Sequence, residues 1–384
     1  MKPIWRAALF FLPLAVTFGT PAIVLWLAGE LTNPDTVIAR QAKGDRFVLH
    51  GPAYTNSATY VKTQRLARHR PQVLALGNSR VMQFRAGFFR PDVSFYNAGG
   101  SVAKIQHFRA FLERLPRDAM PETLLIATDT GYFNTGFDKL EKDGFNIPWL
   151  EKQMTAHTTG NEVFQNNWRK VWSDIAAGKI DWKRLFRLDG LSTHIGLVAV
   201  SKEQGFRNDG SYLYGGTDLD ITNPKHRDYQ FANTLRIIAT GKSRFSWGDA
   251  PNEAALREVD ALLDFCRERK IHVIGFLPPH AHAVWTAMQA LGDKYNYVTK
   301  LEPALRTRFE ARGFEFYDFS DFAMIGAPDI EAIDGYHGSE RTYLRLLIAM
   351  LERGSRLNSR ANLPELRAAL AASKTHTGLF PDRL

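Results

Sequence analysis

Short apolar runs alternate along the chain with longer segments in which apolar residues recur every three or four positions. The short runs are residues 73–76, 93–96, 124–127, 272–277 and 314–319, each bounded by Pro, Gly or charged residues. Such runs are typical of strands buried on both faces. The longer segments are residues 105–115, 253–269 and 301–312, which have the spacing of amphipathic helices. The alternation predicts an α/β fold with a parallel sheet of about five strands covered by helices on both faces.

Residues 132–250 interrupt this alternation and are rich in aromatic, Asn and Gly residues. Because predicted strands of one sheet lie on both sides of them, we interpret them as an insertion rather than as a separate domain. Their aromatic side chains either stack on sugar rings or pack the insertion onto its host. Examples are Trp168, Trp172, Tyr212 and Tyr214. Two further helices are expected near the end, at residues 340–353 and in the tail segment LPELRAALAA.

An uncharged apolar run extends from Ala7 to Ala28. As a helix rising about 1.5 Å per residue, it is long enough to cross a hydrocarbon core of roughly 30 Å. Lys2 and Arg6 precede the run and acidic residues follow it, which predicts a cytoplasmic N-terminus. The alternative is a cleaved signal peptide, but the run exceeds the roughly 7 to 15 apolar residues of such signals. We therefore expect a single-pass anchor in the inner membrane and a periplasmic bulk.

These patterns divide the chain into successive parts. They are a cytoplasmic N-terminus (1–6), a transmembrane anchor (7–29), a membrane-proximal segment (30–70), an α/β domain (71–353) with the insertion (132–250), and a C-terminal tail (354–384). The single cysteine, Cys266, excludes an intramolecular disulfide and is compatible with a periplasmic domain that relies on its core. The net charge of +9 is spread along the chain without a long basic run, so an anionic glycan or lipid head group is expected rather than nucleic acid.

Ser79 follows the first predicted strand in the turn Gly77-Asn78-Ser79. Ligands of open α/β sheets bind at this carboxyl edge, where a serine becomes a nucleophile if a histidine accepts its proton and a third group orients the histidine. Asp334 and His337, in the sequence DGYH before the last helix, are spaced so that their side chains can converge. The alternative is that Asp334 begins a loop and His337 caps the helix. We predict Ser79, His337 and Asp334 as the catalytic residues.

The blocks GNSR and DGYH resemble those of the SGNH (GDSL-like) hydrolases. That family has a flavodoxin-like three-layer fold with its serine after the first strand and Asp-x-x-His near the end. The resemblance covers residues 71–353 apart from the insertion. Together with the N-terminal span, it is similar to the branch of the alginate O-acetylation proteins and the D-alanyl teichoic acid protein. It implies transfer or cleavage of O-acyl, above all O-acetyl, groups on a cell-envelope polysaccharide, with a multi-pass membrane acyltransferase supplying the acyl donor.

The same resemblance implies an oxyanion site. In the family the donors are the backbone N–H of the nucleophile, a second-block glycine and a third-block asparagine, which here correspond to Ser79, to Gly100 in the block after Asn97, and to Asp129. A plain strand-to-helix turn is the alternative at Gly100. An ionised carboxylate cannot donate a hydrogen bond, so Asp129 is protonated, is replaced by a neighbouring threonine, or has another role.

Four further residues are candidates for contact with the substrate or the catalytic groups. They are Arg80, Asn97, Asp129 and His280. Arg80 pairs with an anionic substrate or holds the turn through backbone carbonyls. His280 and His282 follow the fourth predicted strand, but zinc needs a third ligand and none is near in sequence. We expect neither a metal nor a cofactor, and assign His280 to substrate contact, to orientation of the site or to a surface loop.

Three functions are compatible with these residues. The first is a serine acyltransferase or esterase facing the envelope, where a sugar hydroxyl or water accepts the acyl group. The second is a catalytically inactive protein that binds or assembles glycans, which Asp129 and the divergent first block favour. The third, a lipid esterase at the membrane surface, requires an apolar acyl channel.

Overall fold

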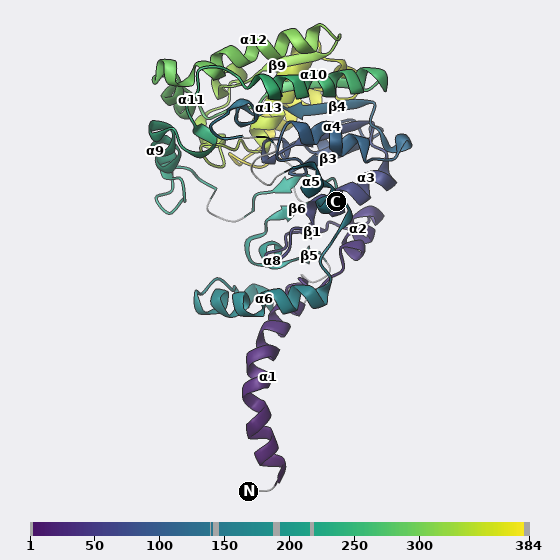
Figure 1. Cartoon of the computed structure of the whole chain (residues 1–384), viewed down its shortest axis with the longest axis vertical. Coiled ribbons are helices and arrows are strands. Elements are labelled where there is room, and N and C mark those ends of the chain that lie inside the picture. Colours follow the sequence, from purple (N-terminus) through teal and green to yellow (C-terminus); the bar gives the residue numbers. More distant parts are fainter. Residues whose placement is uncertain (1–2, 139, 141–145, 187–192, 216–218, 380–384) are drawn as a thin grey trace.

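Five parallel strands form the central sheet of the computed structural model, which describes residues 3–138, 140, 146–186, 193–215 and 219–379 (Figure 1). The strands are β2 (Val73–Gly77), β3 (Phe95–Gly99), β4 (Thr123–Ala127), β8 (His272–Leu277) and β9 (Glu315–Asp318), in the order β3-β2-β4-β8-β9. The predicted α/β fold with a five-stranded parallel sheet is confirmed. The winding direction reverses between β2 and β4, and such a reversal leaves a crevice at the carboxyl ends of the strands.

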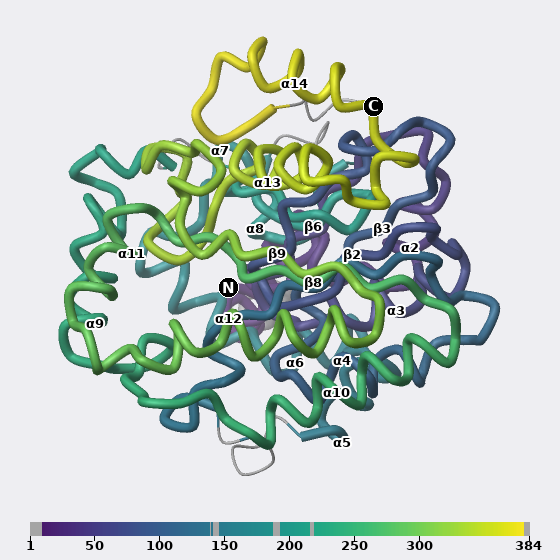
Figure 2. The backbone as a smooth tube through the Cα atoms, turned by 90° about the horizontal axis from the view of Figure 1, so that it is seen from above, coloured from purple at the N-terminus to yellow at the C-terminus, as the bar shows by residue number. Residues whose placement is uncertain are grey.

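Helices cover both faces of this sheet because successive strand residues point in opposite directions. Val73 and Ala75 belong to one apolar cluster, and Leu74 and Leu76 belong to the other. The first cluster includes α9 (Ala232–Thr240), α11 (His282–Gln289) and α13 (Glu340–Glu352), and the second includes α3 (Ala58–His69), α4 (Gln106–Glu113), α10 (Glu253–Glu268) and α12 (Asn296–Glu310). Figure 2 shows α13 on one side of the strands and α10 and α12 on the other.

Most predicted elements agree with the structure within a few residues. The expected strand at 93–96 begins only at Phe95, because the Val93 N–H donates to the Arg90 carbonyl in a turn. Helix α12 begins at Asn296 rather than at residue 301 and accommodates Pro303. The tail segment forms α14 (Leu363–Ala372).

The insertion and the membrane-proximal segment fold together around a second, small sheet. Its order is β5-β1-β6-β7, with β1 (Leu49–His50) from the membrane-proximal segment and β5 (His194–Ile195), β6 (Gly205–Phe206) and β7 (Tyr212–Leu213) from the insertion. The buried Gln41 side chain of α2 (Pro34–Lys43) donates to the Phe206 carbonyl at 3.1 Å. Besides α9, the insertion contains the helices α5 (Ile147–Thr155), α6 (Gly160–Ala176), α7 (Trp182–Leu185) and α8 (Leu197–Lys202). The insertion thus links the α/β domain to the N-terminal part of the chain.

Helix α1 (Pro3–Leu27) projects from the rest of the molecule, and α6 lies across it (Figure 1). It is apolar enough to cross a membrane over Phe10–Leu27. Several of its large apolar side chains are exposed, among them Phe10 (70%) and Trp26 (64%). A helix of a soluble core would bury such side chains.

The other end of α1 packs against the insertion. The Trp172 indole donates to the Thr17 carbonyl at 2.7 Å, and the Trp168 ring lies 4.8 Å from the Phe18 ring. Val24 is buried in the cluster that α6 contributes to. These tryptophans therefore pack the insertion onto α1, one of the two roles predicted for its aromatic side chains.

Leu125, in the middle of β4, is fully buried in the apolar cluster on the α13 face. Replacing it by Ala leaves a cavity, so we expect the free energy of unfolding to fall by about 2–5 kcal/mol. Urea unfolding of the detergent-solubilised chain measures this change. Met324→Ala, at a side chain that is 45% exposed, is the control, and we expect a change within about 0.5 kcal/mol. Equal losses in the two variants would contradict the assignment of Leu125 to the core.

Candidate active site

Ser79 lies at the carboxyl end of β2, beside the point where the sheet reverses its winding. Strand β2 ends at Gly77, and the chain turns at once into a 3₁₀ turn over Ser79–Val81. The Asn78 side chain caps this turn by accepting the backbone N–H of Arg80 at 2.9 Å. The tight turn keeps the serine at the sheet edge.

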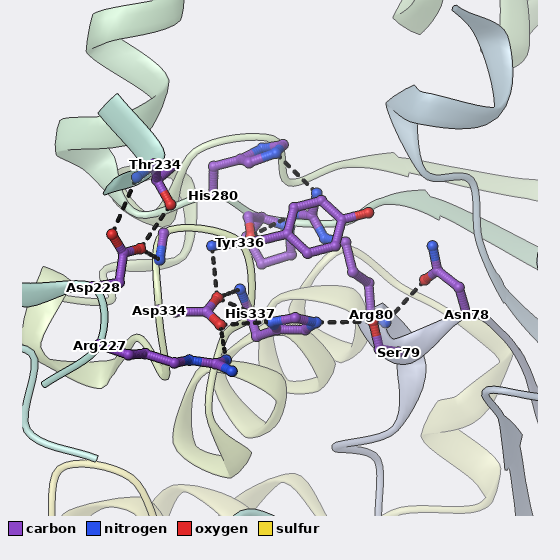
Figure 3. Close-up of polar contacts among 12 residues, drawn as sticks. Asn78, Ser79, Arg80, Arg227, Asp228, Thr234, His280, Asp334, Tyr336 and His337 are labelled. Carbon is purple, nitrogen blue, oxygen red and sulfur yellow. Dashed lines mark hydrogen bonds and ion pairs between the residues drawn. The ribbon is translucent and has the colours of Figure 1, made fainter. Parts of the chain in front are cut away.

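The structure brings Ser79, His337 and Asp334 into one hydrogen-bonded chain (Figure 3). The Ser79 Oγ lies 2.8 Å from the His337 Nε2, and the His337 Nδ1 lies 2.9 Å from the Asp334 Oδ1. Because an ionised carboxylate only accepts hydrogen bonds, it fixes the proton on Nδ1 and leaves Nε2 to accept the serine proton. This geometry suits a histidine base.

Asp334 is ionised in this environment. Burial alone would favour its neutral form, but His337 and the backbone N–H of Tyr336 outweigh burial and hold the pKa of Asp334 well below its usual range. Arg227 adds an ion pair at 2.5 Å, although its side chain is 72% exposed and solvent weakens the pair. The Asp334 Oδ1 also accepts the backbone N–H groups of Tyr336 and His337 at 2.9 and 2.8 Å. The carboxylate therefore orients both the imidazole and the loop that carries it.

A second carboxylate, Asp228 of the insertion, holds the same loop from the other side (Figure 3). It accepts the backbone N–H of Gly335 at 2.9 Å and the Thr234 hydroxyl at 2.6 Å. A Cβ at Gly335 would lie 2.5 Å from Thr234, so a larger residue would displace the loop. Asp228 and Thr234 thus help to position His337 through Gly335, one of the two residues between Asp334 and His337.

Asp129 follows β4 and is buried next to Ser79. It accepts hydrogen bonds from the Asn78 amide at 2.8 Å, from the Gly131 N–H at 2.9 Å and from the Tyr336 hydroxyl. Burial favours the neutral carboxyl, but the charge of Arg80 and these donors outweigh it, so the pKa of Asp129 lies below its usual value. Asp129 is therefore an acceptor that anchors its neighbours and not a protonated substitute for an asparagine.

Arg80 is buried and holds backbone carbonyls, one of its two predicted roles. Its guanidinium donates to the carbonyls of Pro278 and Pro279 at 2.9 and 2.7 Å, and it lies 2.9 Å from the His280 Nε2. Burial and then the Arg80 charge depress the pKa of His280 well below its usual value, so the neutral ring accepts this bond. Neither side chain is among the residues that line the cavity beside Ser79.

Asn97 is not among the residues that line the cavity, and Gly100 has the alternative role that was predicted for it, a plain turn after the strand. The fully buried Asn97 amide donates to the carbonyls of Val81 and Phe84, both at 2.9 Å, and so braces the turn after Ser79. Gly100 lines the cavity with a φ of +83°, but its N–H donates to the Gly77 carbonyl at 2.8 Å. That N–H is therefore not available as an oxyanion donor.

His282 lies apart from His280. Its Nδ1 contacts Asp321 at 3.0 Å, and its side chain is 59% exposed. Within the part of the chain that the structure describes, no group of three His, Cys, Asp or Glu side chains has the arrangement of a metal site.

A cavity of about 330 Å³ opens beside the Ser79 hydroxyl. Its polar wall comes from Asn78, Ser79, Asp129, Tyr336 and Arg244, and the rest is largely apolar. The apolar part consists of Met82, Val102, Ala103, Tyr132 and Phe137. Asn78 donates only one of its two amide hydrogens to Asp129, so the other is a candidate oxyanion donor next to the Ser79 N–H.

Sequence reasoning named Tyr214 only among the aromatic residues of the insertion, and it did not identify the other contributions of the insertion to this site. Arg227 and Asp228 hold the Asp334 loop, Arg244 lines the cavity, and the Tyr214 ring lies 5.9 Å from the His337 ring. None of them belongs to a recognisable motif, because each reaches the site through the fold of the insertion. The one feature of the sequence that these residues share is their location in the same insertion.

Comparisons of the chain with protein-family models, with curated proteins and with solved structures find no match.

The depressed pKa of Asp334 predicts a pH dependence of stability. As the pH falls, the unfolded chain takes up a proton on this carboxyl at about pH 3.9, before the folded chain does. The contribution of Asp334 to the free energy of unfolding is thus present above about pH 5 and is lost progressively below it. Asp334→Asn should flatten this loss in urea unfolding measured between about pH 6 and pH 3.

Asp118→Asn, which removes an exposed carboxylate, is the control for the change in charge. Parallel pH curves for the Asp334→Asn chain and the wild type would contradict an ionised, stabilising Asp334.

Proposed function

We propose that the chain is a serine acyltransferase or esterase that acts through an acyl-Ser79 intermediate. The observation that carries the proposal is the hydrogen-bonded order Ser79 Oγ, His337 Nε2, His337 Nδ1 and Asp334, with contacts of 2.8 and 2.9 Å, at the wall of a cavity. A helix cap or a loop turn would require the aspartate or the histidine, but not a serine hydroxyl at the imidazole nitrogen opposite the carboxylate.

The mechanism follows from this order. His337 Nε2 takes the proton of the Ser79 hydroxyl as its oxygen attacks the acyl carbonyl, and Asp334 stabilises the resulting imidazolium. The imidazolium then protonates the leaving alcohol, and the acyl group remains on Ser79. His337 next activates an incoming hydroxyl, which displaces the acyl group and restores the serine.

Charge develops on the carbonyl oxygen in both steps and requires donors. The Ser79 N–H and the second amide hydrogen of Asn78 are the donors that we assign to this oxygen. Asp129 does not oppose it directly, because its charge is engaged by Asn78, Gly131 and Tyr336. This arrangement answers the objection that an aspartate after β4 precludes catalysis.

A resemblance to the SGNH hydrolases supports the same chemistry. Numbered along the chain, the strands of the central sheet lie in the order 2-1-3-4-5, which is also the order of flavodoxin-like folds. We accordingly assign the α/β domain to an SGNH-like fold, with O-acyl, above all O-acetyl, groups of a cell-envelope polysaccharide as substrate. A multi-pass membrane acyltransferase would deliver the acyl donor.

We further propose that α1 anchors the chain in the inner membrane with the α/β domain in the periplasm. The exposed apolar side chains along α1 support a bilayer environment. The burial of Val24 and Leu25 against the insertion supports retention of the helix, because removal of this segment would expose a packed apolar cluster.

The test of the nucleophile is Ser79→Ala. We expect the turnover number for 4-nitrophenyl acetate to fall by about 10³-fold or more, because the serine and histidine act as a unit. Release of 4-nitrophenol by the detergent-solubilised chain measures this. The matched control is Ser94→Ala, since the Ser94 Oγ also contacts a histidine, His69, at 3.1 Å but does not line the cavity.

Full turnover in the Ser79→Ala chain would exclude Ser79 as the nucleophile. If the wild type turns over neither 4-nitrophenyl acetate nor acetylated sugars, this result would favour the catalytically inactive glycan-binding alternative. Acceleration of product release by added sugar alcohols would identify a transferase rather than an esterase.

A further inference from the structure

The wall of the cavity beside Ser79 includes a positively charged side chain that has no role in the proposed acyl chemistry. Arg244, in the 3₁₀ turn Ser243–Phe245 of the insertion, lines this cavity together with Ser79 and Tyr336. Its guanidinium lies over the Tyr336 ring, 4.1 Å from the centroid. Among the residues that the structure describes, no carboxylate forms an ion pair with it. A half-buried guanidinium without a counter-charge is typical of a site for an anion.

A second arginine on the same ring makes the contrast clear. Arg80 lies 4.5 Å from the Tyr336 centroid, but two proline carbonyls and His280 engage its guanidinium. The charge of Arg80 also offsets Asp129. The negative charge in the cavity wall is thus compensated without Arg244. The positive charge of Arg244 is left for a ligand.

The backbone around Arg244 holds it in place. Ser243 has a φ of +55°, a left-handed conformation that a non-glycine residue adopts only where its surroundings maintain it. The Ser246 hydroxyl donates to the Ser243 carbonyl at 2.6 Å, and the Asn134 amide donates to the Ser246 carbonyl at 2.6 Å. Phe245 is buried in the core. The turn is therefore fixed to the segment after β4, and the guanidinium lies over the Tyr336 ring at the wall of the cavity.

We propose that Arg244 binds a carboxylate carried by the ester substrate, and that the cavity thereby selects anionic esters. The planar guanidinium matches a carboxylate with two parallel hydrogen bonds. A volume of about 330 Å³ is enough for one sugar unit or one short acyl chain. The carboxylate belongs either to the alcohol part, as in a uronic sugar, or to the acyl part, as in a half-ester of a dicarboxylic acid. That the ligand is an ester rests on the proposed function, whereas the binding of a carboxylate by Arg244 does not.

The test measures binding to the full-length Ser79→Ala chain, which cannot consume the probe through Ser79. The probes are a mono-O-acetyl methyl glucuronoside, the corresponding neutral glucoside and monomethyl succinate, titrated by saturation-transfer NMR in detergent. We expect at least one carboxylate probe to bind about 10-fold more tightly than the glucoside. Adding Arg244→Gln should weaken the binding of that probe by about 10- to 100-fold. Lys242→Gln, which removes an exposed positive charge nearby, is the control and should retain the preference.

The outcomes separate the possible sources and the two proposals. Preference for the glucuronoside places the carboxylate on the alcohol, and preference for the succinate places it on the acyl group. Equal binding of all three probes, or a preference that survives Arg244→Gln, overturns the inference. A preference that depends on Arg244 in a chain without esterase or transferase activity supports this inference and refutes only the proposed function. Turnover without any preference for anionic esters supports the proposed function and refutes this inference.

Discussion

The contact between the Ser79 hydroxyl and the His337 imidazole depends on a constraint of parallel sheets: their strands all end at the same edge. Ser79 follows the first strand of the central sheet, and His337 lies in the loop between the last strand and α13, so both belong to that edge. The distance of 2.8 Å further requires that the loop be held from two sides, by the Asp334 carboxylate within it and by Asp228 of the insertion. The site is therefore a product of topology refined by buried polar contacts.

Asp129 illustrates how the fold accommodates a charge beside the serine that we propose as the nucleophile. An unpaired buried carboxylate would be expensive and would oppose an oxyanion. Here three hydrogen bonds and the charge of Arg80 stabilise it, while His280 remains neutral and accepts from Arg80. Asn78 and Asp129 are joined amide to carboxylate across β2 and β4. In our proposal, the amide directly before the serine supplies the oxyanion donor that the SGNH hydrolases have in a third-block asparagine.

The sequence predicted those parts of the molecule whose causes are local. Buried runs such as His272–Leu277 identify strands, and a serine after the first strand with Asp334 and His337 before α13 identifies a triad candidate. The roles of Arg80 and Asn97 were ambiguous because a polar residue after a strand can face the ligand or the backbone, and only packing decides between these. Gly100 had the predicted place but not a free N–H, since that depends on how close the neighbouring strand end lies.

The insertion was the part that the sequence predicted least well, yet it contacts both α1 and the proposed active site. Its Trp168 and Trp172 contact α1, whereas its Asp228 and Arg244 shape the loop and the cavity at the active-site edge. The small sheet in which it pairs with β1 connects these contacts. If α1 crosses the membrane, the insertion and the membrane-proximal segment together set the position of the cavity relative to the bilayer. The proposed substrate selection and the contact with α1 then depend on different residues of the same insertion, while the proposed triad residues come from the host domain.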